Sequence, residues 1–237
     1  MAKKIKIDEV QLPFLEEVSC IDKRYIRCKV LIVCEGEKTE PNYFRSFHMM
    51  KNQSDLVYEI KSEGGRINTV DVVNLAIQLR DKAKKEGNPY DSVWAVFDKD
   101  SFPDDKFNQA IKKAEANGIG CAWSNEAFEL WYVYHFDDRQ TSLSRKEYKS
   151  IITKRVKKKS NRQNYVYQKN DSQMRKILLE CGNEEQAILR ASNQVSQYQD
   201  EKFHTHNPAT TVFRLVSLLK GKDKEFNERI KKELRKK

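Results

Sequence analysis

The stretch VLIVCEGEKTE, residues 30–40, decides the fold of this chain. It begins with four unbroken apolar residues, mostly β-branched, and continues through Cys34 into the acid Glu35 and then Gly36. A short apolar run that is bounded by a turn signal predicts a strand buried on both faces of a parallel sheet. Because ligands of such sheets bind beyond the carboxyl ends of the strands, we expect Glu35 to lie at a functional edge.

A second apolar run ends in the same manner. The segment VWAVF, residues 93–97, leads directly into Asp-Lys-Asp at positions 98–100. Side chains alternate between the two faces of an extended segment, so this spacing predicts that the Asp98 and Asp100 carboxylates point the same way. Two carboxylates aimed at one point repel each other unless a cation lies between them or one is protonated. Hard oxygen ligands of this kind predict Mg²⁺ or Mn²⁺.

Strand-like and helix-like segments alternate along the first part of the chain. Apolar residues recur at helical spacing after residue 40, from a capping pair at Asn68 and Asp71 to about Lys85, and between a helix start at Pro103 and a stop at Asn117-Gly118, with short strand-like runs between these segments. The alternation predicts an α/β fold with three layers, in which helices cover both faces of a mostly parallel sheet.

Four local features carry further structural expectations. Residues 1–27 are mixed in charge and predict an irregular arm that lies over the sheet. Asn125 is expected to cap the helix that follows it, and Asn207–Pro208 is expected to open another helix. The charged tail from Lys220 is expected to fray.

Charge is divided unevenly between the two halves of the chain. The formal net charge is +10, but residues 1–138 contain 20 Lys/Arg against 24 Asp/Glu, whereas residues 139–237 contain 25 against 11. We therefore expect an α/β domain with an N-terminal arm over residues 1–138. A basic helical region over residues 139–237 would pack on that domain or extend from it. The basic half predicts a polyanionic partner, and nucleic acid fits it better than a membrane does.

Cysteine usage and hydropathy argue against several classes of protein. The five cysteines form no C-x-x-C pair, which argues against a disulfide framework and against a zinc knuckle. The sequence shows no signal peptide and no apolar run long enough to span a membrane, so it predicts a cytoplasmic protein. The chain also has no match to the phosphate-binding pattern G-x-x-x-x-G-K-[ST], so any ATPase must be a separate protein.

Three blocks of this sequence resemble the signatures of the RloB-like family. The blocks are CEGEKTEPNYF at 34–44, FDKD at 97–100 and SNEAFELW at 124–131, and a weaker pattern continues to Leu219. The Glu-Gly and Asp-x-Asp strand ends are similar to those of Toprim domains in topoisomerases, primases and overcoming-lysogenization-defect nucleases. This resemblance implies a Toprim-like fold in which Asp98 and Asp100 hold Mg²⁺ and Glu35 is a general acid/base or a third metal ligand.

The resemblance also implies a biological setting. RloB-like and related systems are associated with prokaryotic defence against phage and with abortive infection, often beside an ATPase partner protein. Transfer RNA is one conceivable target.

Two further residues near these blocks are candidates for the site. Glu129 lies among large apolar residues of the third block, where a free charge is costly. It is either a second metal ligand or a hydrogen-bonding scaffold residue. Lys38 follows the first acid and either contacts a substrate phosphate or lies in a solvated loop.

The basic run KRVKKKSNR at 154–162 is the second candidate functional feature. Charge runs are usually solvated faces, but here the whole second half is basic, and Tyr165 and Tyr167 follow as residues that could stack on bases. We interpret the run as a nucleic-acid-binding surface. Its cations are Lys154, Arg155, Lys157, Lys158, Lys159 and Arg162.

The sequence thus predicts a Mg²⁺-dependent Toprim-like nuclease that cleaves phosphodiester bonds in RNA or DNA. Two alternatives remain open. One is a non-catalytic nucleic-acid-binding or effector-interaction module, and the other is a nucleotidyltransferase that uses the same metal site.

Overall fold

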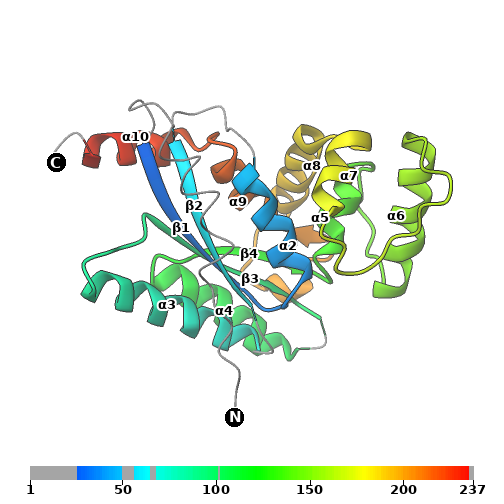
Figure 1. Cartoon of the computed structure of the whole chain (residues 1–237). Helices are drawn as coiled ribbons and strands as arrows, with labels where there is room; N and C mark the ends of the chain where they lie inside the picture. The colour runs from blue at the N-terminus through cyan, green and yellow to red at the C-terminus, as the bar shows by residue number, and fades with distance from the viewer. Residues whose placement is uncertain (1–25, 50–55, 65–67, 101, 235–237) are drawn as a thin grey trace, which may run out of the picture.

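The computed structural model of the chain describes residues 26–49, 56–64, 68–100 and 102–234 (Figure 1). The predicted N-terminal arm over residues 1–27 therefore lies outside the described residues, except for the first two positions of β1. No helix within the described ranges has the length and apolar character needed to cross a bilayer. The elements follow the order β1 (Ile26–Cys34), α2 (Thr39–Arg45), η1 (Ser46–Met49), β2 (Leu56–Gly64), α3 (Thr69–Lys85), β3 (Ser92–Asp98), α4 (Asp104–Ala116), β4 (Gly120–Asn125), α5 (Glu129–Tyr134), α6 (Arg145–Lys159), α7 (Met174–Cys181), α8 (Glu184–Ser196), η2 (Phe203–Thr205), β5 (Ala209–Thr210), α9 (Val212–Leu219) and α10 (Lys224–Leu234).

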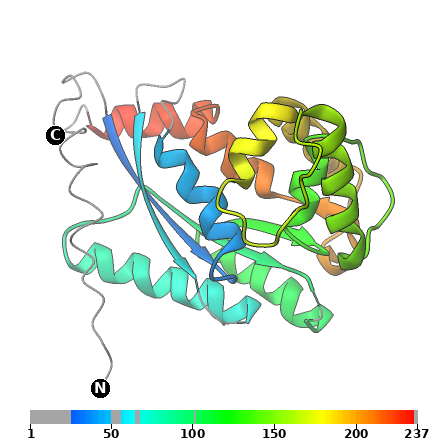
Figure 2. The ribbon, with the colours of Figure 1, turned by 45° about the vertical axis from the view of Figure 1, so that its right-hand side comes forward.

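The sheet has the strand order β2-β1-β3-β4-β5. Its first four strands run parallel, and β5 pairs antiparallel with β4. Helices α3 and α4 cover one face, and α2, α9 and α10 lie on the other (Figure 2). The predicted α/β fold with a mostly parallel sheet is therefore confirmed, and it is consistent with a Toprim-like fold.

Strand β1 explains why its sequence is a continuous apolar run. Val30 and Ile32 pack into the core on the side of α2 and α9, while Leu31 and Val33 pack against α3 and α4 on the opposite side. Side chains alternate faces along a strand, and a strand that has helices on both faces needs apolar residues at every position.

The C-terminal region shares the core of the sheet domain. In β5, Thr210 lies opposite Ser124 of β4, and the apolar residues of α9 join the same buried cluster as β1. The expectation that the tail frays from Lys220 is wrong, because α10 forms there and buries Phe226 and Ile230. Residues 139–234 thus complete the sheet and its core, and the expected boundary at residue 138 stays a prediction.

Two expected helix starts are wrong as well. Asn125 is the last residue of β4, its side-chain amide donates to the His204 carbonyl at 2.9 Å, and α5 begins only at Glu129. Asn207–Pro208 leads into β5, and the next helix begins at Val212. In both places sheet pairing over a long sequence separation prevails over a local capping preference.

Candidate active site

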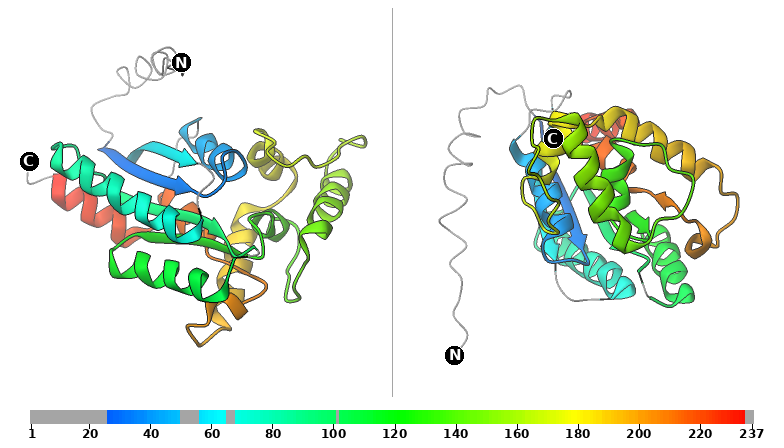
Figure 3. Two further views of the ribbon diagram at one scale, coloured as in Figure 1. Left: turned by 90° about the horizontal axis from the view of Figure 1, so that it is seen from below. Right: turned by 90° about the vertical axis from the view of Figure 1, so that its right-hand side faces the viewer.

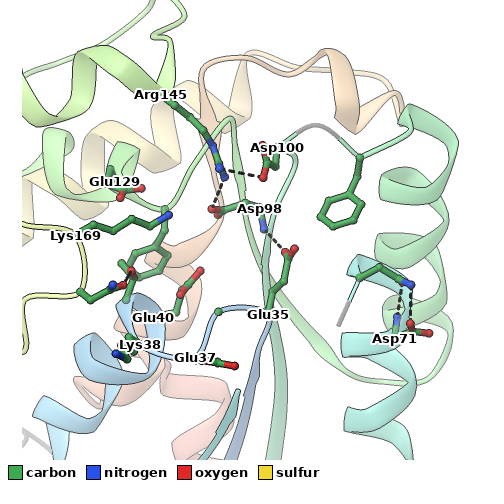
Figure 4. A pocket seen from close by; sticks show the side chains of 16 residues that line it. Glu35, Glu37, Lys38, Glu40, Asp71, Asp98, Asp100, Glu129, Arg145 and Lys169 are labelled. Atoms are coloured by element: carbon green, nitrogen blue, oxygen red, sulfur yellow. Dashed lines mark hydrogen bonds and ion pairs between the residues drawn. The ribbon is translucent and has the colours of Figure 1, made fainter. Parts of the chain in front are cut away.

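Backbone pairing between β1 and β3 brings Glu35 and Asp98 together. The Glu35 N–H donates to the Val96 carbonyl at 2.9 Å, which extends the ladder one residue past β1. The Asp98 N–H in turn donates to Glu35 Oε2 at 3.2 Å. Two acids that are 63 residues apart in sequence therefore lie side by side at the carboxyl ends of neighbouring strands (Figure 4).

Asp100 reaches the same place through a turn. Its φ of 39° lies in the left-handed region, and its N–H donates to the Glu126 carbonyl at 3.2 Å. The Asp98 and Asp100 carboxylates both contact one guanidinium, that of Arg145: Nη1 lies 3.0 Å from Asp100 Oδ2, and Nη2 lies 3.5 Å from Asp98 Oδ2. The two aspartates thus converge, although a turn at Asp100 rather than strand alternation produces the convergence.

These acids line a cavity of about 870 Å³, which we call the acid pocket. Carboxylates outnumber cations in its lining, and some of both come from loops and helices far apart in the sequence. The charged lining residues are Glu35, Glu37, Glu40, Asp71, Asp98, Asp100 and Glu129, with Lys38, Arg145 and Lys169 as the cations.

Glu40 is a buried member of the acid pocket that the sequence motif did not single out. Its residue is only 6% exposed, and its carboxyl group lies against Gly36. A Cβ atom on Gly36 would overlap that carboxyl group, so an alanine at this position would have to push the Glu40 side chain aside. Gly36 and Glu40 both belong to the stretch at residues 30–40. Only the folded structure, which places the Glu40 carboxyl group in the pocket, identifies Glu40 as part of the site.

Burial changes the proton affinities of the clustered acids. Burial raises the pKa of Glu35 to about 7, and the charges of Glu40 and Asp100 add to the rise, against the opposing hydrogen bond from the Asp98 N–H. Burial also raises the pKa of Glu40, helped by the charge of Glu129. The pKa of Asp98 lies well above its usual range, again because of burial first and then the acids around it. Glu35 can therefore gain or lose a proton near neutral pH.

Glu129 has a hydrogen-bond partner inside the protein. The Tyr167 hydroxyl donates to Glu129 Oε1 at 3.1 Å, and both residues are buried. Tyr167 therefore cannot stack on a base, and that hypothesis is wrong for this residue. Glu129 serves as a hydrogen-bond acceptor in the scaffold and also lines the acid pocket.

The acid pocket suits a hard divalent cation in chemical type but does not form a coordination shell. Carboxylate oxygens are the ligands that Mg²⁺ and Mn²⁺ prefer. Within the described ranges, however, no three His, Cys, Asp or Glu residues lie close enough to hold one ion. The Arg145 guanidinium lies at the oxygens of Asp98 and Asp100 instead.

A family model described as RloB-like protein matches residues 30–219, four-fifths of the chain. The chain belongs to the RloB-like family. No curated protein and no solved structure matches it. The matched range includes every residue that lines the acid pocket, so the pocket of this RloB-like protein lies entirely within the family region.

A second hollow of about 820 Å³ lies along helix α6, and we call it the lysine groove. Figure 3 shows α6 at the side of the molecule away from the strands β1 and β2. The helix buries Tyr148, Ile152 and Val156 and turns its lysines outward. The lining residues are Lys146, Lys149, Ser150, Thr153, Lys154, Lys157, Lys158 and Gln163. In the described part of the chain, none of these five lysines pairs with an acid.

The structure separates the predicted basic run of the RloB-like protein into two groups. Lys154, Lys157 and Lys158 line the lysine groove, and Lys159 is exposed just beyond it. The two arginines are engaged elsewhere: Arg155 Nε lies 2.6 Å from Asp137 Oδ2, and Arg162 Nη2 lies 2.5 Å from Glu180 Oε2. Their guanidinium groups are therefore paired with acids of the protein itself.

Four cations of the two sites escaped sequence reasoning. Lys146 and Lys149 share the groove with the predicted lysines because residues three or four apart lie on one helix face, and this spacing is a signal that could have found them. Arg145 and Lys169 reach the acid pocket from outside the three sequence blocks. No pattern in the sequence marks them, since only the fold brings α6 and the loop before α7 to the strand ends. Lys38, by contrast, was predicted and lies exposed at the pocket.

Proposed function

We propose that this RloB-like protein is a metal-dependent nuclease that cleaves phosphodiester bonds in RNA or DNA. The observation that carries the proposal is the hydrogen bond between Glu35 and Asp98 in a pocket that Asp100 shares. Acids with perturbed pKa values that are gathered in a cavity at strand ends are typical of catalytic sites. Their convergence gives acid–base chemistry a defined place.

Five pocket residues have a role in this proposal. Glu35, with a pKa of about 7, would accept or donate the proton of the reacting water or of the leaving oxygen. Asp98 and Asp100 would supply oxygen ligands. When bound, Mg²⁺ or Mn²⁺ would activate water and neutralise phosphate charge. The cations Lys38 and Lys169 line the same cavity and would orient the phosphate backbone.

The lysine groove supports a nucleic acid as the substrate. Its lysines are neighbours on one helix, where like charges three or four residues apart are mutually destabilising. A phosphate backbone would relieve that repulsion and release bound counter-ions. Helix α6 carries both Arg145, in the acid pocket, and the groove lysines, so one polyanion could reach both sites.

A non-catalytic nucleic-acid-binding or effector-interaction module is the second candidate function. The spacing of the acids favours it, because the described residues form no ready coordination shell. A nucleotidyltransferase would use the same acids, and it would make product from nucleoside triphosphates instead of shortening a polymer. A role in prokaryotic anti-phage defence, with a separate ATPase partner, is a further proposal that rests on the family resemblance.

The substitution Asp98→Asn tests the nuclease proposal. We expect a loss of about a thousand-fold in cleavage rate with Mg²⁺ or Mn²⁺, because one pocket carboxylate is removed with little change in shape. Cleavage of labelled single-stranded RNA, transfer RNA and duplex DNA is the measurement. Asp105→Asn is the matched control, since Asp105 is an exposed acid of α4 outside the pocket.

Two outcomes would contradict the proposal. Unchanged cleavage in the Asp98→Asn chain would remove this carboxylate from the reaction. Nucleic-acid binding without cleavage of any of the three substrates, by the unaltered chain, would favour the non-catalytic module.

A further inference from the structure

Arg145 holds the aspartate pair in the acid pocket. It is the first residue of α6, and its guanidinium reaches both carboxylates, at 3.0 Å from Asp100 and 3.5 Å from Asp98 (Figure 4). Among the described residues it is the sole cation within ion-pair distance of either aspartate. Because an arginine side chain keeps its charge in proteins, it supplies a permanent positive charge where the acids need one.

Helix α6 does not account for the place of this arginine. The helix start is already capped, because the Ser144 N–H and hydroxyl both donate to Glu147 Oε2 at 2.8 Å. A cation in the first turn lies at the positive end of the helix dipole, which is its unfavourable end. The partners of Arg145 therefore lie in the acid pocket, and the helix would be no weaker without it.

The two sides of this contact differ in their freedom to move. The Arg145 side chain is 39% exposed, whereas the Asp98 side chain is 13% exposed and has Glu35 and Glu40 as neighbours. The guanidinium can swing toward solvent, but Asp98 cannot leave the pocket. Departure of Arg145 would leave partly buried carboxylates without a counter-charge, a costly arrangement unless another cation replaces it.

We propose that Arg145 is an internal counter-ion that competes with a divalent metal for Asp98 and Asp100, and that a substrate phosphate draws it away. The inference rests on the proposed nuclease function and concerns the regulation of the same site. Arginine binds phosphate through two parallel N–H groups, so a nucleic-acid backbone offers the guanidinium an alternative partner. Metal and substrate then each raise the affinity for the other, as linkage between two sites requires.

Calorimetric titration of the full-length chain with MnCl₂ tests the competition. We expect Arg145→Gln to bind Mn²⁺ about two- to fivefold more tightly than the unaltered chain, the effect of removing one partly exposed ion pair. The matched control is Arg80→Gln, because Arg80 also pairs with a carboxylate, at 2.9 Å, has a side chain 30% exposed and lies outside the pocket. The control should bind Mn²⁺ as the unaltered chain does.

A second variant keeps the test decisive if Arg145→Gln fails to fold, which circular dichroism would show. In Arg145→Lys a single ammonium replaces the fork that bridges the two carboxylates, so this chain should also bind Mn²⁺ more tightly than the unaltered one. Equal Mn²⁺ affinity in all folded chains overturns the inference but leaves the nuclease proposal to the Asp98→Asn assay. Absence of Mn²⁺ binding in every chain overturns the inference and the metal dependence together.

Anisotropy of a labelled single-stranded oligonucleotide tests the part played by the substrate. In a Glu35→Gln background, which should not cleave, Mn²⁺ is expected to tighten oligonucleotide binding. The tightening should be at least threefold smaller when Arg145→Gln is added, since no guanidinium remains to be transferred to phosphate. Equal tightening in the two chains overturns the transfer of Arg145 to the substrate.

Discussion

The acid pocket and the lysine groove both gather like charges, but the protein treats the two regions differently. Five of the seven pocket acids are partly or fully buried, and Arg145 and Lys169 lie among them as counter-charges. The groove lysines stand on one side of a helix, open to solvent, and have no acid among their lining residues. The acid pocket thus contains cations that partly neutralise its acids, whereas the charge of the lysine groove can be neutralised only by a ligand.

Neutralising lysines of the groove should produce the largest effect, a loss of nucleic-acid affinity. The triple substitution Lys149→Gln, Lys154→Gln and Lys157→Gln is expected to weaken nucleic-acid binding about a hundred-fold at ~50 mM salt. The slope of log affinity against log salt should fall by about 2 for a single strand. Anisotropy titrations across a salt series measure both quantities.

A control variant separates this local effect from net charge. Lys82→Gln, Lys84→Gln and Lys85→Gln remove the same charge from α3, on exposed positions outside both hollows. Should the α3 chain lose as much affinity as the groove chain, the groove is not a distinct binding surface and the contrast with the pocket fails.

The acid pocket should make the free energy of unfolding depend on pH. Because the pKa of Glu35 is raised to about 7, the folded protein keeps a proton that the unfolded chain releases near its ordinary value of 4.5. The free energy of unfolding should therefore fall as pH rises from about 4.5 to about 7, and Glu35 should contribute about 2 kcal/mol of that fall. Urea denaturation in a chelator at pH 5 and pH 8 measures it.

The matched comparison again uses the groove. Glu35→Gln should flatten the pH dependence by that amount, whereas Lys154→Gln should leave it unchanged. If the two variants retain the same pH dependence as the unaltered chain, the Glu35 carboxyl does not have the raised pKa that its burial implies.

Substitutions that alter side-chain packing should give the smallest difference between the two regions, measured as the free energy of unfolding. Gly36→Ala should lower the free energy of unfolding by about 1 kcal/mol, since the new methyl group displaces the flexible Glu40 carboxyl. In a Glu40→Ala background the same change should cost little, and a double-mutant cycle measures the coupling. Ser150→Ala in the open groove should change stability by less than about 0.5 kcal/mol. Additive effects of Gly36→Ala and Glu40→Ala would contradict the close approach.

The sequence predicted the features that depend on local pattern. The apolar run at residues 30–34 indicated a central strand, and every one of its side chains is buried. The acid after it, Glu35, lines the acid pocket. Asp98 and Asp100 were identified by their position after a second strand. The two strand predictions succeed because one strand's pattern and end are properties of a few consecutive residues.

The features that sequence reasoning missed depend on long-range packing. Arg145 and Lys169 reach the acid pocket only because α6 and the following loop fold back over the strand ends; the Thr39 hydroxyl, which donates to Asn170 Oδ1 at 2.7 Å, helps to hold that loop. Arg155 was assigned to a binding surface by the charge of its neighbours, yet its pairing with Asp137 depends on the fold. The sequence alone likewise does not show whether the Tyr167 ring is buried or exposed, and the structure shows that it is buried.

The position of strand β5 late in the sequence has a consequence for co-translational folding. Its two residues, Ala209 and Thr210, close the edge of β4, and Thr211 Oγ1 accepts the Trp123 N–H at 2.9 Å. A nascent chain that has emerged only to the third sequence block already carries Glu35, Asp98 and Asp100, yet it lacks the last strand and half of the apolar core. Because β5 and α9 complete that core, we expect the acid pocket of this RloB-like protein to reach its final form only after both elements have been translated.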